Sequence, residues 1–158
     1  MKILLAIDGS GHSEAAANQI ARQRFPAGSE VRVISVVEPP YYPVTYEGGA
    51  VSVRFYEEME KGARERANAA VIKAAATLRA DKESRQLNVE TKVLDGSAKR
   101  VILEEAETFG ADLIVVGSHG QGNFERFLLG SVSQAVALHA KCSVEIVRSP
   151  KAQSPASQ

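Results

Sequence analysis

The stretch VVGSHGQGNFERFLLGSVSQAV, which runs from Val115 to Val136, decides how the rest of the sequence is interpreted. It begins in an apolar run, crosses a loop with four glycines and enters a segment with helical spacing near Ser131. Glycine-rich connections between a strand and a helix are typical of loops whose backbone N–H groups bind an anion. Because Gln134 follows Ser131 by three residues, the spacing predicts a capping box with Ser131 as the helix N-cap.

The glycines of this loop have two competing interpretations. Gly117 ends the apolar run, where a sharp exit favours a residue that can take a positive φ. Absent side chains at Gly117, Gly120 and Gly130 would let a phosphate approach the backbone beside the positive end of a helix dipole. A flexible surface loop before an ordinarily capped helix is the alternative, and spacing alone leaves both open. A P-loop lysine is missing, and Glu125 stands where a G-x-G-x-x-G motif needs its third glycine.

Apolar runs alternate with helical patterns along the chain. Strands are predicted over 3–7, 30–38, 88–94, 112–117 and 144–147. Helices are predicted over 13–25, over 54–81, over 97–110 with Gly110 as the stop, and from Ser131. In the long helix an apolar face is predicted at Met59, Ala63, Ala67, Ala70, Val71, Ala74 and Leu78. The order predicts an α/β protein with a parallel sheet and helices on both faces.

Ligands of such sheets bind outside the carboxyl ends of the strands. Three segments with unusual residues leave strands at that edge: Asp8-Gly9-Ser10, residues 36–40 and the glycine loop. A carboxylate at position 8 is suited to accept from a sugar hydroxyl or to hold a hydrated metal ion. A helix-capping aspartate is the alternative for Asp8, and it stays open.

Composition narrows the class of protein. The 158 residues suit one domain, and 19 basic residues balance 19 acidic ones. This balance excludes the basic footprint of a general nucleic-acid binder. A single cysteine, Cys142, argues against a disulfide-stapled secreted protein. The first apolar run is too short for a signal peptide and no run is long enough for a membrane span, so we expect a cytoplasmic protein without membrane contact.

The loop resembles the G-2x-G-9x-G-[ST] motif of the universal stress protein family in its ATP-binding branch. Gly117, Gly120, Gly130 and Ser131 match the motif, and the opening ILLAIDGSGHSEAA and the strand VISVVEPP are also similar to that family. The resemblance covers 1–148 as one universal stress protein domain and leaves 149–158 as a polar tail expected to be disordered. It implies a Rossmann-like, five-stranded parallel sheet in the order 3-2-1-4-5.

The resemblance also implies a site for ATP with Mg²⁺ or Mn²⁺. Asp8 would contact the ribose or the metal–phosphate region, and the backbone of Val36 would contact adenine. The expected nucleotide-binding residues are Asp8, Gly9, Ser10, Val36, Gly117, Ser118, His119, Gly120, Gln121, Gly122, Gly130, Ser131, Val132 and Ser133. Asp8 is the one expected protein ligand of the metal, together with phosphate oxygens and water.

The resemblance further implies a homodimer through the last strand, 144–148, because an edge strand is a natural site for pairing. Three interpretations of Glu145 within it stay open: cross-pairing with a cation such as Arg148 in the dimer, opposition to dimerisation, or an exposed edge charge that protects against aggregation. The leading functional hypothesis is a regulatory stress-response protein that binds ATP and hydrolyses it slowly at most, because no residue is placed to orient an attacking water. The alternative is an interaction or chaperone-like module that uses the same fold without nucleotide.

Overall fold

The computed structural model describes residues 1–39, 53–80, 87–120 and 129–149. Five parallel strands form one sheet in the order β3-β2-β1-β4-β5. The strands are β1 (Lys2–Ala6), β2 (Glu30–Val37), β3 (Asn88–Asp95), β4 (Leu113–Gly117) and β5 (Ser143–Val147). The helices are α1 (Gly11–Arg22), α2 (Val53–Ala80), α3 (Ala98–Phe109) and α4 (Ser131–His139). The fold and the strand order are those expected from the sequence.

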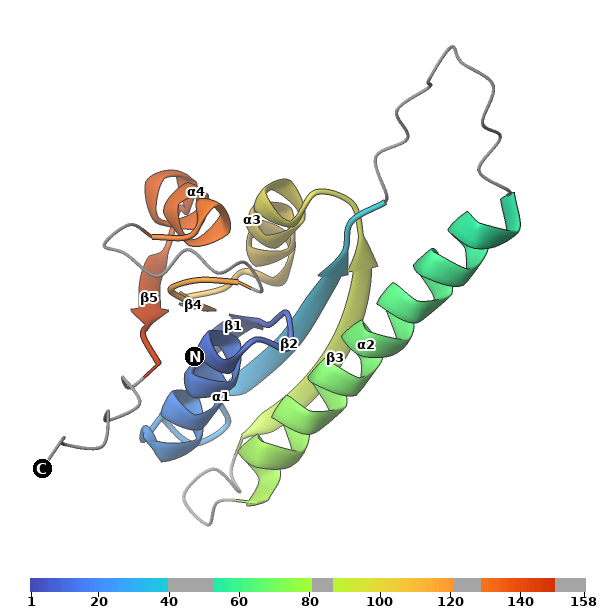
Figure 1. The fold of residues 1–158 in the computed structure, drawn as a ribbon. Coiled ribbons are helices and arrows are strands. Elements are labelled where there is room, and N and C mark those ends of the chain that lie inside the picture. Colours follow the sequence, from blue (N-terminus) through green and yellow to red (C-terminus); the bar gives the residue numbers. More distant parts are fainter. Residues whose placement is uncertain (40–52, 81–86, 121–128, 150–158) are drawn as a thin grey trace, which may run out of the picture.

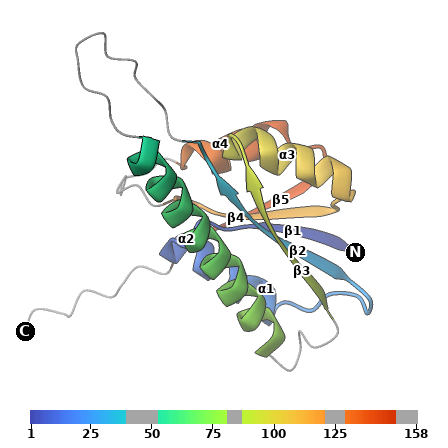
Figure 2. The same cartoon turned by 90° about the vertical axis from the view of Figure 1, so that its right-hand side faces the viewer.

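The sheet is the middle of three layers. Helices α1 and α2 cover one face, and α3 and α4 cover the other (Figures 1 and 2). Successive residues of β1 serve opposite faces, because Ile3 and Leu5 pack with α1 and α2 whereas Leu4 packs with α3. Burial on both sides explains why this strand is apolar at consecutive positions.

Helix α2 fits the predicted pattern over its second half only. Ala67, Val71, Ala74 and Leu78 are buried against the sheet, as the spacing predicted. Met59, expected on the same face, is 47% exposed. Figure 1 shows the reason, because the beginning of α2 lies away from the sheet and only its later turns lie along β3. The predicted burial of Met59 is therefore wrong.

Local signals fix the ends of α3. Gly110 takes the left-handed conformation, with φ of 69°, and ends the helix as predicted. The first turn has a cap that the sequence did not indicate. Ser97 occupies the N-cap without a side-chain hydrogen bond, and the carboxylate of Glu38 instead accepts from Ala98 N–H at 2.7 Å. This bond ties the end of β2 to the start of α3.

Strand β5 forms one edge of the sheet. Glu145 in this strand accepts hydrogen bonds from the Gln23 side-chain amide at 3.1 and 3.2 Å. Within one chain the Glu145 carboxylate thus binds an amide at the end of α1, and pairing of Glu145 with Arg148 across a dimer stays a prediction. Within the described residues, no helix combines the length and the apolar composition that a bilayer span requires.

Candidate functional site

A cavity of about 290 Å³ opens at the carboxyl ends of the strands. This volume lies near the lower end of the range of small-molecule sites, roughly 300–1,000 Å³. Its lining combines the end of β1, the second half of β2, the end of β4 and the starts of α3 and α4. The position is the one where open parallel sheets bind ligands.

Asp8 lies against the glycine loop, although more than a hundred residues separate them in sequence. A Cβ added to Gly120 would lie 2.8 Å from Oδ2 of Asp8. The other oxygen, Oδ1, accepts from Ser10 N–H at 3.0 Å, which holds the carboxylate in a local turn. Asp8 therefore orders the turn after β1 and lines the cavity. Ser10 rather than Asp8 is the N-cap of α1, so the helix-capping alternative is wrong, and the role of Asp8 as a ligand group stays a prediction.

Gly117 and Gly130 are needed for close packing of the backbone. A Cβ at Gly117 would meet the backbone of His12 and Ser13 at 2.8 Å, and one at Gly130 would meet His119 Cα and Ser118 O at 3.2 Å. Among the described glycines, positive φ occurs at positions 9, 28, 96 and 110. The expected positive φ at Gly117 is therefore wrong, and the close approach of α1 is the reason for a glycine there.

The start of α4 differs by one residue from the predicted capping box. Gly130 is the N-cap and Ser131 is the first helical residue, and among the described residues no side chain caps the helix. The predicted cap at Ser131 is wrong because a glycine can occupy the N-cap at little cost. Ser131 is instead exposed and lines the cavity. Because the N-cap residue is a glycine, it has no side chain that could accept a hydrogen bond from the N–H groups of the first helical turn.

The serines beside the loop have different surroundings. Ser133 is buried. Its hydroxyl donates to the carbonyl oxygens of Ser118 at 3.0 Å and Gly130 at 2.8 Å. Gly130 N–H also donates to Ser118 O at 2.8 Å. These bonds hold the two ends of the loop together. Ser118 itself is 1% exposed and does not line the cavity, whereas His119 and Val132 do.

The remaining expected residues are distributed as follows. Val36 lines the cavity. Gly9 takes a φ of 79° and lines a different, smaller hollow between α1 and α2. Ser10 is the N-cap of α1 and accepts from Ser13 N–H. Gln121 and Gly122 lie outside the described residues.

The inner wall of the cavity is apolar, a feature that the glycine motif did not indicate. It comprises Ala6, Ile7, Ile34, Val36, Ala98, Ile102, Val116 and Val132. Ile34 and Val116 could have been found from strand register, because β1 separates β2 from β4 and brings these residues to the same level. The site thus has an apolar end and an end formed by glycine backbone, Ser131 and His119.

A metal ion would find few protein ligands here. The described part of the chain contains no group of three or more His, Cys, Asp or Glu side chains suited to bind one. Asp8 is the acidic residue among those that line the cavity. One carboxylate fits Mg²⁺, which keeps several waters and commonly binds through one or two carboxylates plus substrate phosphates.

The chain matches the model of the universal stress protein family over residues 1–148. A putative universal stress protein of Staphylococcus epidermidis is 34% identical over 151 residues, covering 92% of this chain and 82% of that protein. The universal stress protein UspA from Lactobacillus plantarum has a similar fold, with a TM-score of 0.74, 23% identity, and coverage of 94% and 97%. A family protein from Arabidopsis thaliana with bound AMP has a TM-score of 0.68, 17% identity, and coverage of 99% and 96%.

The fold and its cavity define a parallel α/β protein with a ligand site at the carboxyl edge of the sheet. With the match over nearly the whole chain, the family is clear as well. The chain belongs to the universal stress protein family.

Proposed function

We propose that this protein binds ATP in the cavity between β1, β2 and β4, with a divalent metal ion at Asp8, and acts as a regulatory protein. The observation that carries the proposal is the convergence of Asp8, the glycine backbone and the uncapped start of α4 on one cavity with an apolar inner wall. An apolar wall suits a planar base, whereas backbone N–H groups at a helix start suit phosphate oxygens. The bound AMP in the Arabidopsis relative supports an adenine nucleotide as the ligand.

The parts of the nucleotide would meet different groups. The base would pack against the apolar wall that contains Val36 and Ile102. The phosphates would accept from N–H groups near Gly130 and from the Ser131 hydroxyl, which lies at the cavity without a cap bond. Asp8 would bind the metal, and the metal would supply charge neutralisation for the phosphates. We assign no catalytic residue, so turnover of bound ATP is expected to be slow at most.

We also propose a homodimer formed through β5. This strand is at the sheet edge, where an unpaired backbone favours pairing with a second copy. The Gln23 amide already binds both carboxylate oxygens of Glu145, so Glu145 would need no cation from the partner. A cytoplasmic location accompanies this proposal, in line with a nucleotide ligand.

Titration with ATP and Mg²⁺ tests the nucleotide site. The protein is stripped of ligand by denaturation and refolding, and binding heat is measured for wild type, Ser131→Ala and Ser97→Ala. Both serines are exposed residues at helix starts without a side-chain cap bond, but only Ser131 lines the cavity. We expect Ser131→Ala to weaken ATP binding about tenfold, the cost of one hydrogen bond to a charged group, and Ser97→Ala to bind like wild type.

Two outcomes would count against the proposal. A stripped wild type with no ATP affinity below millimolar would favour the alternative, a module that works through its surfaces without nucleotide. Equal affinity in Gly130→Val and wild type would place the phosphates elsewhere, because the Cβ of a side chain at Gly130 would press on His119 Cα and Ser118 O at 3.2 Å and disturb the loop proposed to bind them.

A further inference from the structure

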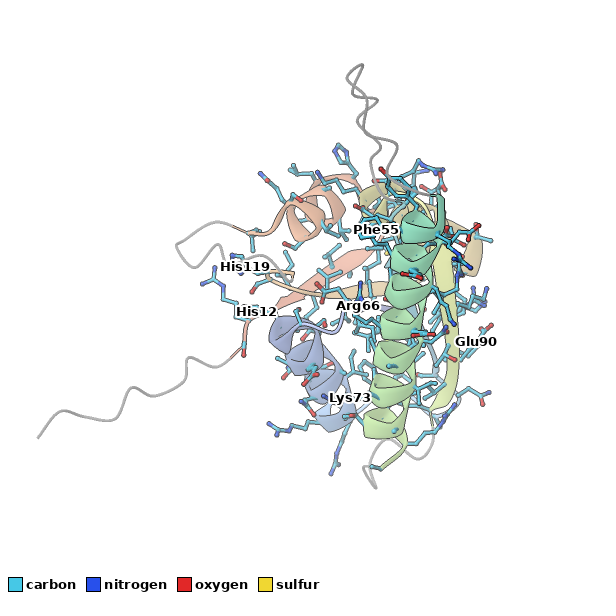
Figure 3. All side chains as sticks on the ribbon, turned by 45° about the vertical axis from the view of Figure 1, so that its right-hand side comes forward. His12, Phe55, Arg66, Lys73, Glu90 and His119 are labelled. Atoms are coloured by element: carbon cyan, nitrogen blue, oxygen red, sulfur yellow. The ribbon has the colours of Figure 1, made fainter. Side chains whose placement is uncertain are left out.

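Two imidazole rings enclose a buried serine hydroxyl directly behind the cavity. His12 belongs to the first turn of α1 and His119 follows β4, and Figure 3 shows both side chains at the same end of the molecule. Their ring centroids are 5.2 Å apart. The Ser118 hydroxyl lies 3.3 Å from Nδ1 of His12 and 3.1 Å from Nδ1 of His119. Of the three residues, only His119 lines the cavity.

The backbone after β5 determines which ring nitrogen of His12 carries the proton. Ser149 N–H donates to Nδ1 of His12 at 3.2 Å. A backbone N–H is always a donor, so Nδ1 of His12 carries no proton and its single lone pair is occupied. A neutral His12 then has its proton on Nε2.

The direction in which the Ser118 hydroxyl donates its proton follows from the number of acceptors that remain available. Ser118 has one hydroxyl proton and two candidate acceptors, the Nδ1 atoms of the two rings. The lone pair of His12 is already used by Ser149, and the distance to His119 is the shorter of the two. The hydroxyl therefore donates to Nδ1 of His119, and the proton of that ring is placed on Nε2.

We propose that His12 is a positioning residue that fixes His119 as the Nε2–H tautomer and so makes it an N–H donor on the wall of the cavity. The inference rests on the proposed function where it takes the ligand to be an anionic polyphosphate, for which an N–H donor is attractive and a bare ring nitrogen is repulsive. The residues form a chain from the backbone after β5 through His12 and Ser118 to His119. The end of the strand proposed to pair in the dimer is thereby connected to the nucleotide site.

The competing state has the opposite polarity. If the hydroxyl donated to His12, then Nδ1 of His119 would donate to the hydroxyl and its Nε2 would be a bare acceptor. That state asks the single lone pair of His12 to accept two donors, because Ser149 N–H is already bonded there. Removing the Ser149 N–H should therefore favour it.

Nitrogen-15 NMR of the histidine rings distinguishes the two states, because a protonated and a bare ring nitrogen differ in chemical shift and coupling pattern. The full-length, nucleotide-free protein is measured at a pH where the rings are neutral, and His12→Gln and His119→Gln assign the signals. We expect the Nε2–H form of His119 in wild type. An Nδ1–H form in wild type overturns the proposal without any variant.

Ser149→Pro removes the backbone donor, and Ser149→Ala is the matched control that retains it. We expect the control to keep His119 in the Nε2–H form and the proline variant to shift it towards Nδ1–H. An unchanged tautomer in Ser149→Pro would overturn the coupling through His12.

Titration with ATP and Mg²⁺ tests the link to the ligand. We expect Ser149→Pro to bind about tenfold more weakly than Ser149→Ala, the loss of one hydrogen bond to a charged group. Equal affinities would overturn the link between the His119 proton and the ligand. A wild type that binds no ATP would overturn the proposed function instead, and the ring spectra would still decide where the proton lies.

Discussion

Replacing Gly117 by alanine tests whether the first glycine of the loop serves folding or ligand approach. The glycine ends β4, and α1 begins directly beside it. A methyl group there would lie 2.8 Å from the carbonyl carbon of His12 and 2.8 Å from the amide nitrogen of Ser13. Both atoms are helix backbone and cannot rotate away, so the substitution must displace α1 or β4.

The size of the effect follows from the distance. An ordinary contact of a Cβ begins at 3.4 Å, so the backbone must move by about 0.6 Å from its position at 2.8 Å. Helix α1 is held by buried residues such as Ala16, Ala17 and Ile20, which resist such a shift. Overpacking of this kind costs about 1–3 kcal/mol. For a chain of this size the melting temperature falls by about 2–4 °C for each kcal/mol.

Urea unfolding of the nucleotide-free protein measures the change. We expect Gly117→Ala to lower the midpoint with an unchanged m-value. Gly11→Ala is the matched control, because a Cβ at that first residue of α1 meets nothing within 4 Å, so its stability should equal or slightly exceed that of wild type. A Gly117→Ala protein as stable as wild type would refute the packing explanation and leave ligand approach as the reason for the glycine.

Three further predictions follow from the structure. Glu38→Ala should lower the free energy of unfolding by about 1 kcal/mol through loss of the α3 cap, whereas Ser97→Ala, which removes no cap bond, should leave urea unfolding unchanged. Burial, and to a lesser extent the nearby Asp112 carboxylate, raises the pKa of the Cys142 thiol. Because the thiolate is the reactive form, alkylation of Cys142 should need a higher pH than alkylation of a free thiol, and Asp112→Asn should lower that pH; a wild-type profile like that of a free thiol would contradict this. ATP should bind more tightly than AMP, and Asp8→Asn should reduce this preference in Mg²⁺, as measured by calorimetry; equal affinities of the wild type would contradict the placement of the outer phosphates.

The layers of the fold could be predicted because the signals that define them are local. Consecutive apolar residues in β1 and β4 reveal strands buried on both faces, and Gly110 marks the end of α3. The order of the strands is a different matter. The side chains of β1 do not indicate that β4 rather than β3 lies beside it. The strand order is predicted by the family resemblance alone.

The candidate site was predictable in its location but not in its contacts. Parallel strands bring Asp8 and the glycine loop to one edge, and a hydrogen-bonded turn holds Asp8 there. The bond from Ser149 to His12 joins residues 137 positions apart, and Glu38 reaches α3 from 60 positions away. Such contacts depend on how whole elements are placed, so no local pattern could indicate them.

The close packing around the glycines weakens the glycine motif as evidence for nucleotide binding. An intact glycine motif would favour a nucleotide-binding protein if glycine were needed only to admit phosphate. In this structure a side chain at Gly117 would overlap the backbone of α1, and one at Gly130 would press on the returning loop, both without a ligand. At Gly120 a side chain would meet the end of the Asp8 side chain. A protein of this fold without a nucleotide would therefore still be more stable with glycine at position 117 and, to a smaller extent, at position 130. The choice between the two functional hypotheses therefore depends on Ser131, which lines the cavity but supplies no cap bond to the helix it begins.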